Sequence, residues 1–221
     1  MTDPDLMWQL AVVDMAGTTI ADGGLIITAI TSAMAEVAPR QKIDLDEVRR
    51  LRGASKRDLF AALAPTKVDA AVNAFNLFLR ELVSGGLVTA VPGASEAIRI
   101  LRNSGVRVCL ATGLDRSIAN LILEQLDWTD LPDLLLTSGE VGRGRPHPDL
   151  VLTAAIRARV TSMNRVVVCG DTVNDLNSGA NAGAGLLVGV LTGAHDREQL
   201  QSVPSATVVD SVADVPALLA L

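Results

Sequence analysis

Short apolar runs alternate with stretches of helical apolar spacing along most of the chain. The runs that predict buried strands are residues 8–13, 106–112, 134–138, 165–170, 186–190 and, more weakly, 207–209. The intervals that predict helices are a stretch from Pro92-Gly93 to about Gly105 and residues 115–125, 148–159 and 174–182. Strands that alternate with helices are typical of a parallel sheet with right-handed crossovers. We therefore expect an α/β fold.

A helical stretch interrupts this alternation directly after the first strand. Apolar residues recur at helical spacing over 25–38 and 66–84, and Ser55 with Asp58 resembles a capping box that opens a helix between them. The alternation of strands and helices resumes near residue 91. The expected division is a sheet domain of residues 1–21 and 91–221, and an inserted helical domain of residues 22–90.

Composition narrows the class of protein. The 221 residues are 49% hydrophobic and 20% charged, which is enough apolar material for a core and excludes a disordered chain. No apolar run approaches the ~18 residues of a membrane span, and the acidic start of the chain lacks the basic region of a signal peptide. A net charge of −6 argues against nucleic acid as a partner. Cys109 and Cys169 both fall in apolar runs, so we expect buried thiols in a reducing cytoplasm.

Basic residues concentrate in the helical stretch. Residues 22–90 hold nine basic and eight acidic residues, whereas the rest of the chain holds ten and seventeen. Five of the basic residues fall within nine positions that contain no acid: Arg49, Arg50, Arg52, Lys56 and Arg57. The pattern fits a solvated helical face, and it equally fits a cationic patch that meets an anionic substrate.

Polar side chains stand at the predicted carboxyl ends of the strands, where open α/β sheets form their ligand sites. Asp14 ends the first strand, Thr112 ends the second, and Asp171 follows the strand at 165–170, with Asp175 one helical turn later. Arg145 lies in a loop between strands. We expect these side chains to meet at one edge of the sheet.

Each of these residue types has a task in phosphoryl transfer. A carboxylate such as Asp14 can attack phosphorus, and Asp14 with Asp171 can hold Mg²⁺. The hydroxyl of Thr112 and the backbone N–H of Gly113 can bind a phosphoryl oxygen, while Arg145 can pair with the phosphoryl group and orient Asp14. Taken singly, every one of these residues also fits a helix cap or a turn.

Two motifs together are far more specific. Asp-Met-Ala-Gly-Thr-Thr begins at Asp14 and Gly-Asp-Thr-Val-Asn-Asp ends at Asp175, each after an apolar strand. With Thr112 and Arg145 between them, the chain resembles the haloacid dehalogenase superfamily of hydrolases over nearly its whole length. The resemblance implies a Rossmann-like parallel-sheet core with an inserted α-helical cap of the C1 type, a Mg²⁺ ion and an aspartyl intermediate.

The resemblance also implies roles for individual residues. Asp14 is the expected nucleophile, with Thr112 and Arg145 as further catalytic residues. The expected Mg²⁺ ligands are the carboxylates of Asp14, Asp171 and Asp175 and the backbone carbonyl of Ala16. Ala16, Gly17, Arg52 and Gly113 are the expected substrate contacts.

Ala16 is an informative departure from most phosphatases of the superfamily, which carry a second Asp at this position as general acid. An Ala in this place resembles phosphonoacetaldehyde hydrolase, which cleaves a carbon–phosphorus bond through a Schiff base on a cap lysine. Lys56, in Gly53-Ala54-Ser55-Lys56, matches that lysine and is an expected catalytic residue. Arg52, Leu59 and Leu114 stand where phosphonatases carry Met, His and Tyr.

The expected function is a Mg²⁺-dependent, phosphonatase-like hydrolase of a small phosphonate or phosphorylated metabolite. One alternative is a phosphate-ester phosphatase in which Lys56 binds an anion only, and another is a protein that binds a phosphorylated metabolite without catalysis. A phosphosugar mutase is disfavoured by Ala16. The partner is a small anionic molecule rather than a membrane or nucleic acid, and a homodimer is consistent with relatives of this cap type. We interpret His147 and His195 as loop surface residues, with a role as proton shuttle as the alternative.

Overall fold

The computed structural model describes residues 7–21 and 23–221. Residues 1–6, which carry part of the acidic start used to argue against a signal peptide, lie outside the described residues. So does residue 22, the first of the expected helical domain. Within the described part of the chain, no helix is long and apolar enough to cross a membrane.

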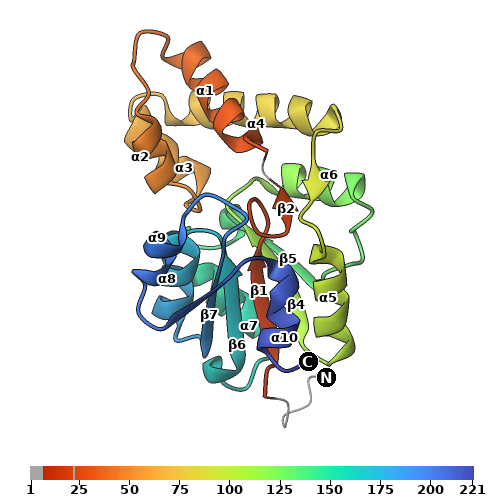
Figure 1. Ribbon diagram of the computed structural model, residues 1–221. Coiled ribbons are helices and arrows are strands. Elements are labelled where there is room, and N and C mark those ends of the chain that lie inside the picture. The colour runs from red at the N-terminus through yellow and green to blue at the C-terminus, as the bar shows by residue number, and fades with distance from the viewer. Residues whose placement is uncertain (1–6, 22) are drawn as a thin grey trace.

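One parallel sheet organises the chain (Figure 1). Among the described residues it has six strands in the order β5-β4-β1-β6-β7-β8. The strands are β1 (Leu10–Asp14), β4 (Arg107–Thr112), β5 (Leu134–Thr137), β6 (Val166–Gly170), β7 (Leu186–Val190) and β8 (Ala206–Val209). Strand β1 lies inside the sheet between β4 and β6, and Asp14 is in register with Ala111 of β4. The predicted parallel α/β fold is confirmed.

Helices cover both faces of this sheet, which explains why β1 is apolar throughout rather than alternating. Ala11 and Val13 belong to the hydrophobic core on one face, and Leu10 and Val12 to the core on the other. The first face is covered by α5 (Ala94–Asn103), α6 (Arg116–Gln125) and α10 (Val215–Leu218). The second is covered by α7 (Asp149–Arg157), α8 (Val173–Ala182) and α9 (Arg197–Gln201).

A helical segment lies beyond the carboxyl ends of the strands (Figure 1). It comprises α1 (Leu25–Val37), α2 (Leu45–Arg50), α3 (Lys56–Leu63) and α4 (Val68–Ser84). The chain enters through β2 (Ile20–Ala21) and leaves through β3 (Thr89–Ala90), which pair antiparallel. The predicted cap on α3 forms, because the Ser55 hydroxyl accepts the Asp58 N–H at 3.1 Å. Division of the chain into two domains stays a prediction.

The apolar interior of the helical segment is built around two aromatic rings. Phe60 of α3 and Phe75 of α4 are fully buried and meet edge to face, with ring centroids 5.9 Å apart. This interior continues into the core on the α5–α6 face of the sheet. The helical segment therefore rests on the sheet through apolar contacts as well as through β2 and β3.

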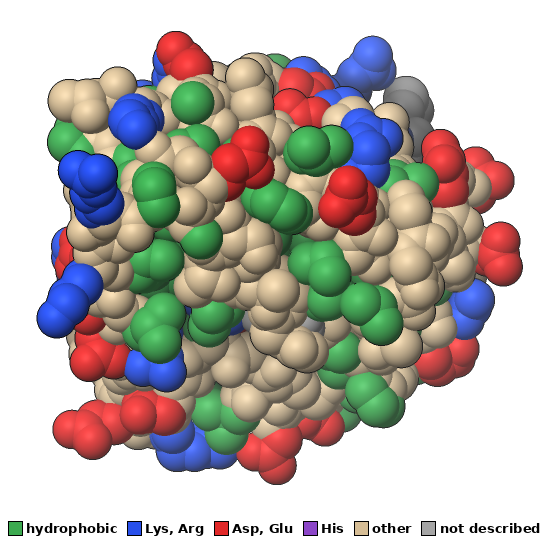
Figure 2. All heavy atoms as spheres, turned by 90° about the horizontal axis from the view of Figure 1, so that it is seen from above, with side chains coloured by type: hydrophobic (Ala, Val, Ile, Leu, Met, Phe, Trp, Pro, Cys, Tyr) green, Lys and Arg blue, Asp and Glu red, His purple; other side chains and the backbone are tan. Residues whose placement is uncertain are grey.

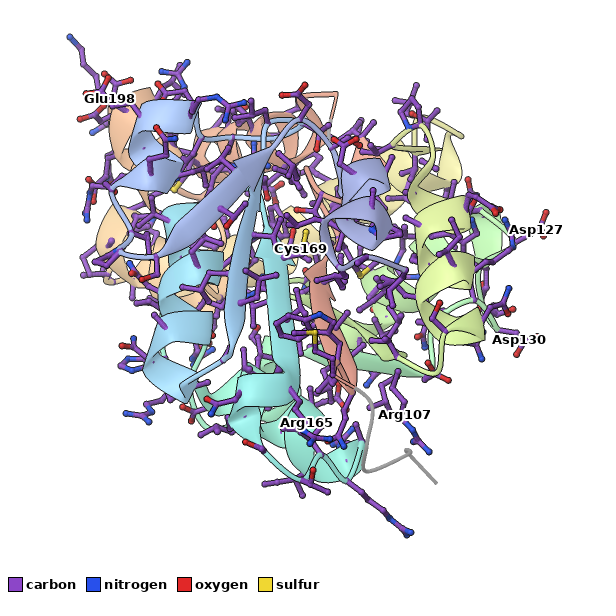
Figure 3. All side chains as sticks on the ribbon, turned by 60° about the horizontal axis from the view of Figure 1, so that its bottom comes forward. Arg107, Asp127, Asp130, Arg165, Cys169 and Glu198 are labelled. Carbon is purple, nitrogen blue, oxygen red and sulfur yellow. The ribbon has the colours of Figure 1, made fainter. Side chains whose placement is uncertain are left out.

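The opposite end of the sheet carries basic side chains. Figure 3 shows Arg107 and Arg165 at the amino ends of β4 and β6.

Cys169 of β6 and Cys109 of β4 are buried and unbridged, as the sequence predicts. Burial raises the pKa of the Cys109 thiol to about 12 and also raises that of Cys169, so neither is a thiolate near neutral pH.

Candidate active site

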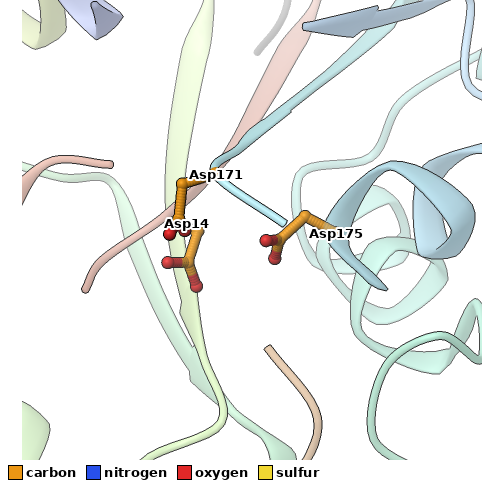
Figure 4. A group of neighbouring side chains, drawn as sticks. All are labelled: Asp14, Asp171 and Asp175. Atoms are coloured by element: carbon orange, nitrogen blue, oxygen red, sulfur yellow. The ribbon is translucent and has the colours of Figure 1, made fainter. Parts of the chain in front are cut away.

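Three buried carboxylates meet at the carboxyl edge of the sheet (Figure 4). Asp14 is the last residue of β1, Asp171 directly follows β6, and Asp175 lies in the first turn of α8. One oxygen from each can be chosen so that all three lie within 4.8 Å of one another. The adjacent strands β1 and β6 place the first two, and the Thr172 N-cap fixes the start of the helix that carries the third.

Arg145, in the loop before α7, contacts two of these three carboxylates. Its Nη1 lies 2.6 Å from Oδ1 of Asp14 and 2.9 Å from Oδ1 of Asp175. Its Nη2 donates to the carbonyl oxygen of Ala111 at 2.9 Å. Because Arg145 is only 5% exposed, these contacts hold the guanidinium in one orientation and orient the Asp14 carboxylate through it.

Burial and the crowding of negative charge both raise the pKa values of the carboxyl groups. Burial raises the pKa of Asp14 to about 6, with Arg145 opposing the rise and Asp175 adding to it. Burial, with the neighbouring charges of Asp14 and Asp175, raises the pKa of Asp171 to about 8. The same carboxylates raise the pKa of Arg145 against the effect of its burial, so it stays a cation.

The donor set fits a hard divalent cation. Oδ1 of Asp175 is buried and has no aligned hydrogen-bond donor among the described residues, although Arg145 is near. One oxygen of Asp171 is already fixed by the backbone N–H of Ala194 at 2.7 Å. Carboxylate oxygens from Asp14, Asp171 and Asp175 are the ligand type that Mg²⁺ takes, usually with several waters. A cation here would relieve the repulsion from Asp14 and Asp175, which adds to the effect of burial on the pKa of Asp171.

Gly17 lies against Asp171 in the turn that follows β1. Its φ is +99°, and a Cβ added to it would stand 2.3 Å from Oδ2 of Asp171. Position 17 therefore needs glycine for the backbone conformation and for this close approach. Ala16, beside it, is half-buried. The carbonyl of Ala16 as a metal ligand and Gly17 as a substrate contact stay predictions.

Thr112 and Gly113 lie where β4 ends. Thr112 is buried, and its hydroxyl accepts the backbone N–H of Leu114 at 3.2 Å. A Cβ added to Gly113 would stand 2.6 Å from the carbonyl oxygen of Ala54 in the helical segment. The small size of Gly113 thus lets the connection between α2 and α3 come down onto the sheet edge.

A cavity of about 870 Å³ opens between the helical segment and the sheet loops. Lys56, Gly113 and Arg145, three of the predicted site residues, are among those that line it. The Nζ of Lys56 lies 5.7 Å from the centroid of the Phe75 ring, within the range of a cation–π contact. Lys56 therefore faces a space that a small substrate can enter.

The four arginines of the basic stretch divide into two groups. Arg49, Arg50 and Arg57 are exposed and pair with Asp46, Glu47 and Asp69 at 2.6, 2.6 and 2.7 Å. Figure 2, which views this end of the molecule, shows basic and acidic side chains interspersed. Arg52 differs, because it is 7% exposed and its charge lowers the pKa of Asp171. The solvated interpretation thus fits three residues, and Arg52 lies near the carboxylates.

Two side chains that the sequence analysis left out of the site stand at its edge. Asn174 lies inside the second motif and donates to the carbonyl oxygen of Arg52 at 2.6 Å. His195 is 7% exposed and accepts the Val173 N–H through Nδ1 at 3.0 Å, so its assignment to the surface was wrong. The position of Asn174 in the motif was the available signal. The loop that brings His195 back leaves no local pattern. His147 is exposed, as predicted.

Known proteins share this fold and these motifs. The family description of haloacid dehalogenase-like hydrolases matches residues 8–183. A probable phosphatase IndB from Dickeya dadantii is 28% identical over 216 residues, 95% of this chain and 92% of that protein. A phosphonoacetaldehyde hydrolase from Bacillus cytotoxicus is 30% identical over 215 residues, 85% of this chain and 77% of that protein.

Among solved structures, a hydrolase from Pseudomonas syringae has a TM-score of 0.85 at 22% identity. That match covers 96% of this chain and 98% of the other, and it shows a common fold. The family match, by contrast, spans both motifs and all the residues from β1 through α8. The chain therefore belongs to the haloacid dehalogenase-like hydrolases.

Proposed function

We propose that this chain is a Mg²⁺-dependent phosphohydrolase that transfers the phosphoryl group of a small anionic metabolite to Asp14 and then to water. The observation that carries the proposal is the grouping of Asp14 with Arg145, Asp171 and Asp175. Arg145 holds Oδ1 of Asp14 at 2.6 Å, and the three carboxylates share one buried corner. A binding protein would need neither the oriented carboxylate nor the clustered charge.

The chemistry follows from the positions of these residues. The Asp14 carboxylate forms a bond to phosphorus while the bond from phosphorus to the leaving oxygen breaks, and the result is an aspartyl-phosphate. Because Ala16 has no proton to give, the leaving oxygen takes its proton from water or leaves as a stable anion. Water then attacks phosphorus, which releases phosphate and restores Asp14. Thr112 and Gly113, at the end of β4, bind phosphoryl oxygens in this proposal.

Asp14, Asp171, Asp175 and the carbonyl of Ala16 would hold the Mg²⁺ ion. When bound, the ion supplies positive charge to the phosphoryl oxygens and balances the three carboxylates. Residues 22–90 act as a cap domain that excludes water and brings Arg52 and Lys56 to the substrate. The two buried free thiols support a cytoplasmic location.

A phosphate monoester is the substrate class that the surroundings of Lys56 support best. The contact between its Nζ and the Phe75 ring stabilises the protonated ammonium, whereas an imine requires the neutral amine. Lys56 then acts as a fixed cation that pairs with a substrate anion. Ala16 further favours esters whose leaving group needs no general acid.

Cleavage of a carbon–phosphorus bond is the second candidate. It is favoured by Ala16 together with Lys56, which lines the cavity beside Gly113 and Arg145. The similarity to the Bacillus cytotoxicus phosphonoacetaldehyde hydrolase supports this candidate, and the similarity to the Dickeya dadantii phosphatase supports the first.

The test measures phosphate release with Mg²⁺ from a panel of small phosphate monoesters and from phosphonoacetaldehyde. Borohydride is added in parallel, and mass spectrometry looks for a reduced adduct on Lys56. Phosphate from esters without an adduct supports the first candidate, while phosphate from phosphonoacetaldehyde with the adduct establishes the second. Lys56→Arg keeps the charge but cannot form an imine, so it should retain ester hydrolysis and abolish the second reaction. No phosphate from any compound overturns the proposal.

A further inference from the structure

The connection between α2 and α3 sits directly on the first turn of α8. We call residues 49–54, the end of α2 and most of this connection, the docking loop. Asn174 Nδ2 donates to the carbonyl oxygen of Arg52 at 2.6 Å, and a Cβ added to Gly53 would stand 2.3 Å from Oγ1 of Thr172. Gly53 also has a φ of +81°. The docking loop therefore approaches α8 as closely as glycine alone allows.

His195 makes a second connection from the sheet to the docking loop. Its backbone N–H donates to the carbonyl of Asp171 at 3.2 Å, and its Nδ1 accepts the Val173 N–H at 3.0 Å. A ring that accepts at Nδ1 carries its proton on Nε2 when neutral. That Nε2 faces the carbonyl oxygen of Arg49 at 3.3 Å. His195 is thus anchored to the core and presents a donor to the loop.

The same few residues serve the carboxylate cluster and the docking loop. Asp171 and Asp175 face the cluster, and Asn174 between them faces the loop. Thr172 does both, because its hydroxyl donates to Oδ2 of Asp175 and packs against Gly53. The docking loop and the carboxylate cluster therefore share contacts at the first turn of α8.

Within the docking loop, Arg52 is the residue whose side chain acts on the carboxylates. It is 7% exposed, and its charge acts on Asp171. Asn174 holds the carbonyl oxygen of this same residue. An arginine side chain has several rotatable bonds. If its backbone is already fixed, less conformational entropy is lost when the side chain binds an anion.

We propose that Asn174 and His195 are positioning residues that fasten the docking loop over the carboxylates and so place Arg52 for the phosphoryl group of the substrate. The inference deepens the proposed function and rests on it. Neither side chain enters the covalent step. Their effect on the reaction passes through the docking loop and is measured as substrate affinity.

Asn174→Leu removes the donor without adding charge near the carboxylates. We expect KM for the best phosphate monoester to rise about 5-fold or more, the effect of one lost hydrogen bond, while kcat changes much less. Asn174→Gln keeps an amide that can reach the loop and should restore most of the affinity. The matched control is Asn103→Leu, at the exposed end of α5, which should leave both constants unchanged. An unchanged KM in Asn174→Leu overturns the proposal.

A double-mutant cycle with Arg52→Ala distinguishes positioning from general stability. If Asn174 acts through Arg52, Asn174→Leu should add almost nothing to the KM of the Arg52→Ala protein. Full additivity of the two changes would mean that Asn174 works independently of Arg52, and would refute the proposed role.

Two substitutions of His195 separate its contacts. Asn can replace Nδ1 as acceptor for Val173 but is too short to reach Arg49, whereas Gln can supply a donor near the position of Nε2. His195→Asn should therefore raise KM and His195→Gln should raise it less. Equal effects of both would remove His195 from the proposal.

Hydrogen exchange keeps this inference testable even if no substrate is found. The backbone amides of residues 49–54 should exchange about 5-fold faster in Asn174→Leu than in the wild type or in Asn103→Leu. If exchange is faster in Asn174→Leu but the wild type hydrolyses none of the compounds, the docking contact is supported and the proposed function is refuted. Unchanged exchange in an active enzyme would refute the docking alone.

Discussion

Arg145 and Asp14 form a buried ion pair in which Nη1 and Oδ1 lie 2.6 Å apart, although 131 residues separate them in the chain. The same Nη1 also contacts Asp175, so one guanidinium pairs with two of the three clustered carboxylates. A buried pair of this kind is costly to break because the remaining charge has no partner.

Arg145→Met should therefore destabilise the fold as well as the reaction. We expect the free energy of unfolding to fall by about 3–5 kcal/mol in denaturant titrations and phosphate release to be lost. Arg145→Lys keeps a cation but not the bond to the Ala111 carbonyl, so it should lose less of both. Equal stability of the Met variant and the wild type would contradict the role of this pair.

Asp14→Asn should abolish turnover and leave the fold intact. The amide cannot attack phosphorus, so we expect kcat to fall by about 10⁴-fold or more, with circular dichroism unchanged. Asp130→Asn, at an exposed position away from the cluster, is the matched control (Figure 3). Substantial activity in Asp14→Asn would show that another residue is the nucleophile.

The stability of the metal-free protein should fall as the pH rises. Because burial raises the pKa of Asp171 to about 8 from its ordinary 3.8, the folded chain holds a proton that the unfolded chain releases. Between about pH 4 and pH 8 this group removes up to about 1.4 kcal/mol of stability per pH unit. Mg²⁺ competes with that proton. The Tm of the protein with Mg²⁺ should therefore exceed its Tm with EDTA by more at about pH 8 than at about pH 6.

Asp171→Asn serves as the control for this titration, since it removes the carboxyl group with the higher pKa and leaves Asp14, whose pKa is about 6. The Tm difference between Mg²⁺ and EDTA should become smaller in this variant and lose most of its dependence on pH. A wild-type difference that is the same at both pH values would argue against a metal ion at these carboxylates.

Gly17→Ala should weaken Mg²⁺ binding. An added methyl group would collide with Oδ2 of Asp171, and the backbone at φ +99° would also be strained. Gly86→Ala places the same methyl at φ +74° where nothing lies within 4 Å, so it measures strain alone. We expect both variants to lose some stability, about 1–2 kcal/mol in Gly86→Ala, and Gly17→Ala alone to lose the Tm gain from Mg²⁺.

Ala16→Asp should install a general acid. Ala16 borders a small apolar space lined by Leu79 and Leu114, so a carboxyl group there would be partly desolvated and its pKa raised. We expect the hydrolysis of esters with poor leaving groups to rise by about 10²-fold, and that of p-nitrophenyl phosphate to change little. No gain with the esters that have poor leaving groups would mean that the missing acid at position 16 does not limit their hydrolysis.

The sequence predicts the fold well where the signal is local. Buried strands such as β1 and β6 are continuous apolar runs, and the Ser55 cap marks the start of α3. The two-residue strands β2 and β3 were missed because two positions carry no periodicity. Short helices such as α9 and α10 were missed for the same reason.

The same distinction between features with and without a local sequence signal applies to the candidate site. Asp14, Asp171 and Asp175 could be chosen because each lies at or shortly after the carboxyl end of a strand of a parallel sheet. The contact of Asn174 with Arg52 depends on how the helical segment settles on α8, and no pattern within either stretch encodes it. The backbone N–H of Ala194 on Asp171 has no sequence signature, since every residue type but proline offers one.

The pairing of β2 with β3 puts Ala21 opposite Thr89. The two points where the polypeptide leaves and rejoins the sheet are therefore neighbours. The intervening segment has both of its chain connections at one place, in addition to its packing contacts with the sheet helices and with α8. A donor segment from a related enzyme needs to match one spacing at its two ends and the packing contacts on α8 to be grafted there, while Asp14, Arg145, Asp171 and Asp175 all lie outside the exchanged stretch. Under the proposed cap role of residues 22–90, substrate preference in this scaffold can thus be exchanged without rebuilding the carboxylates.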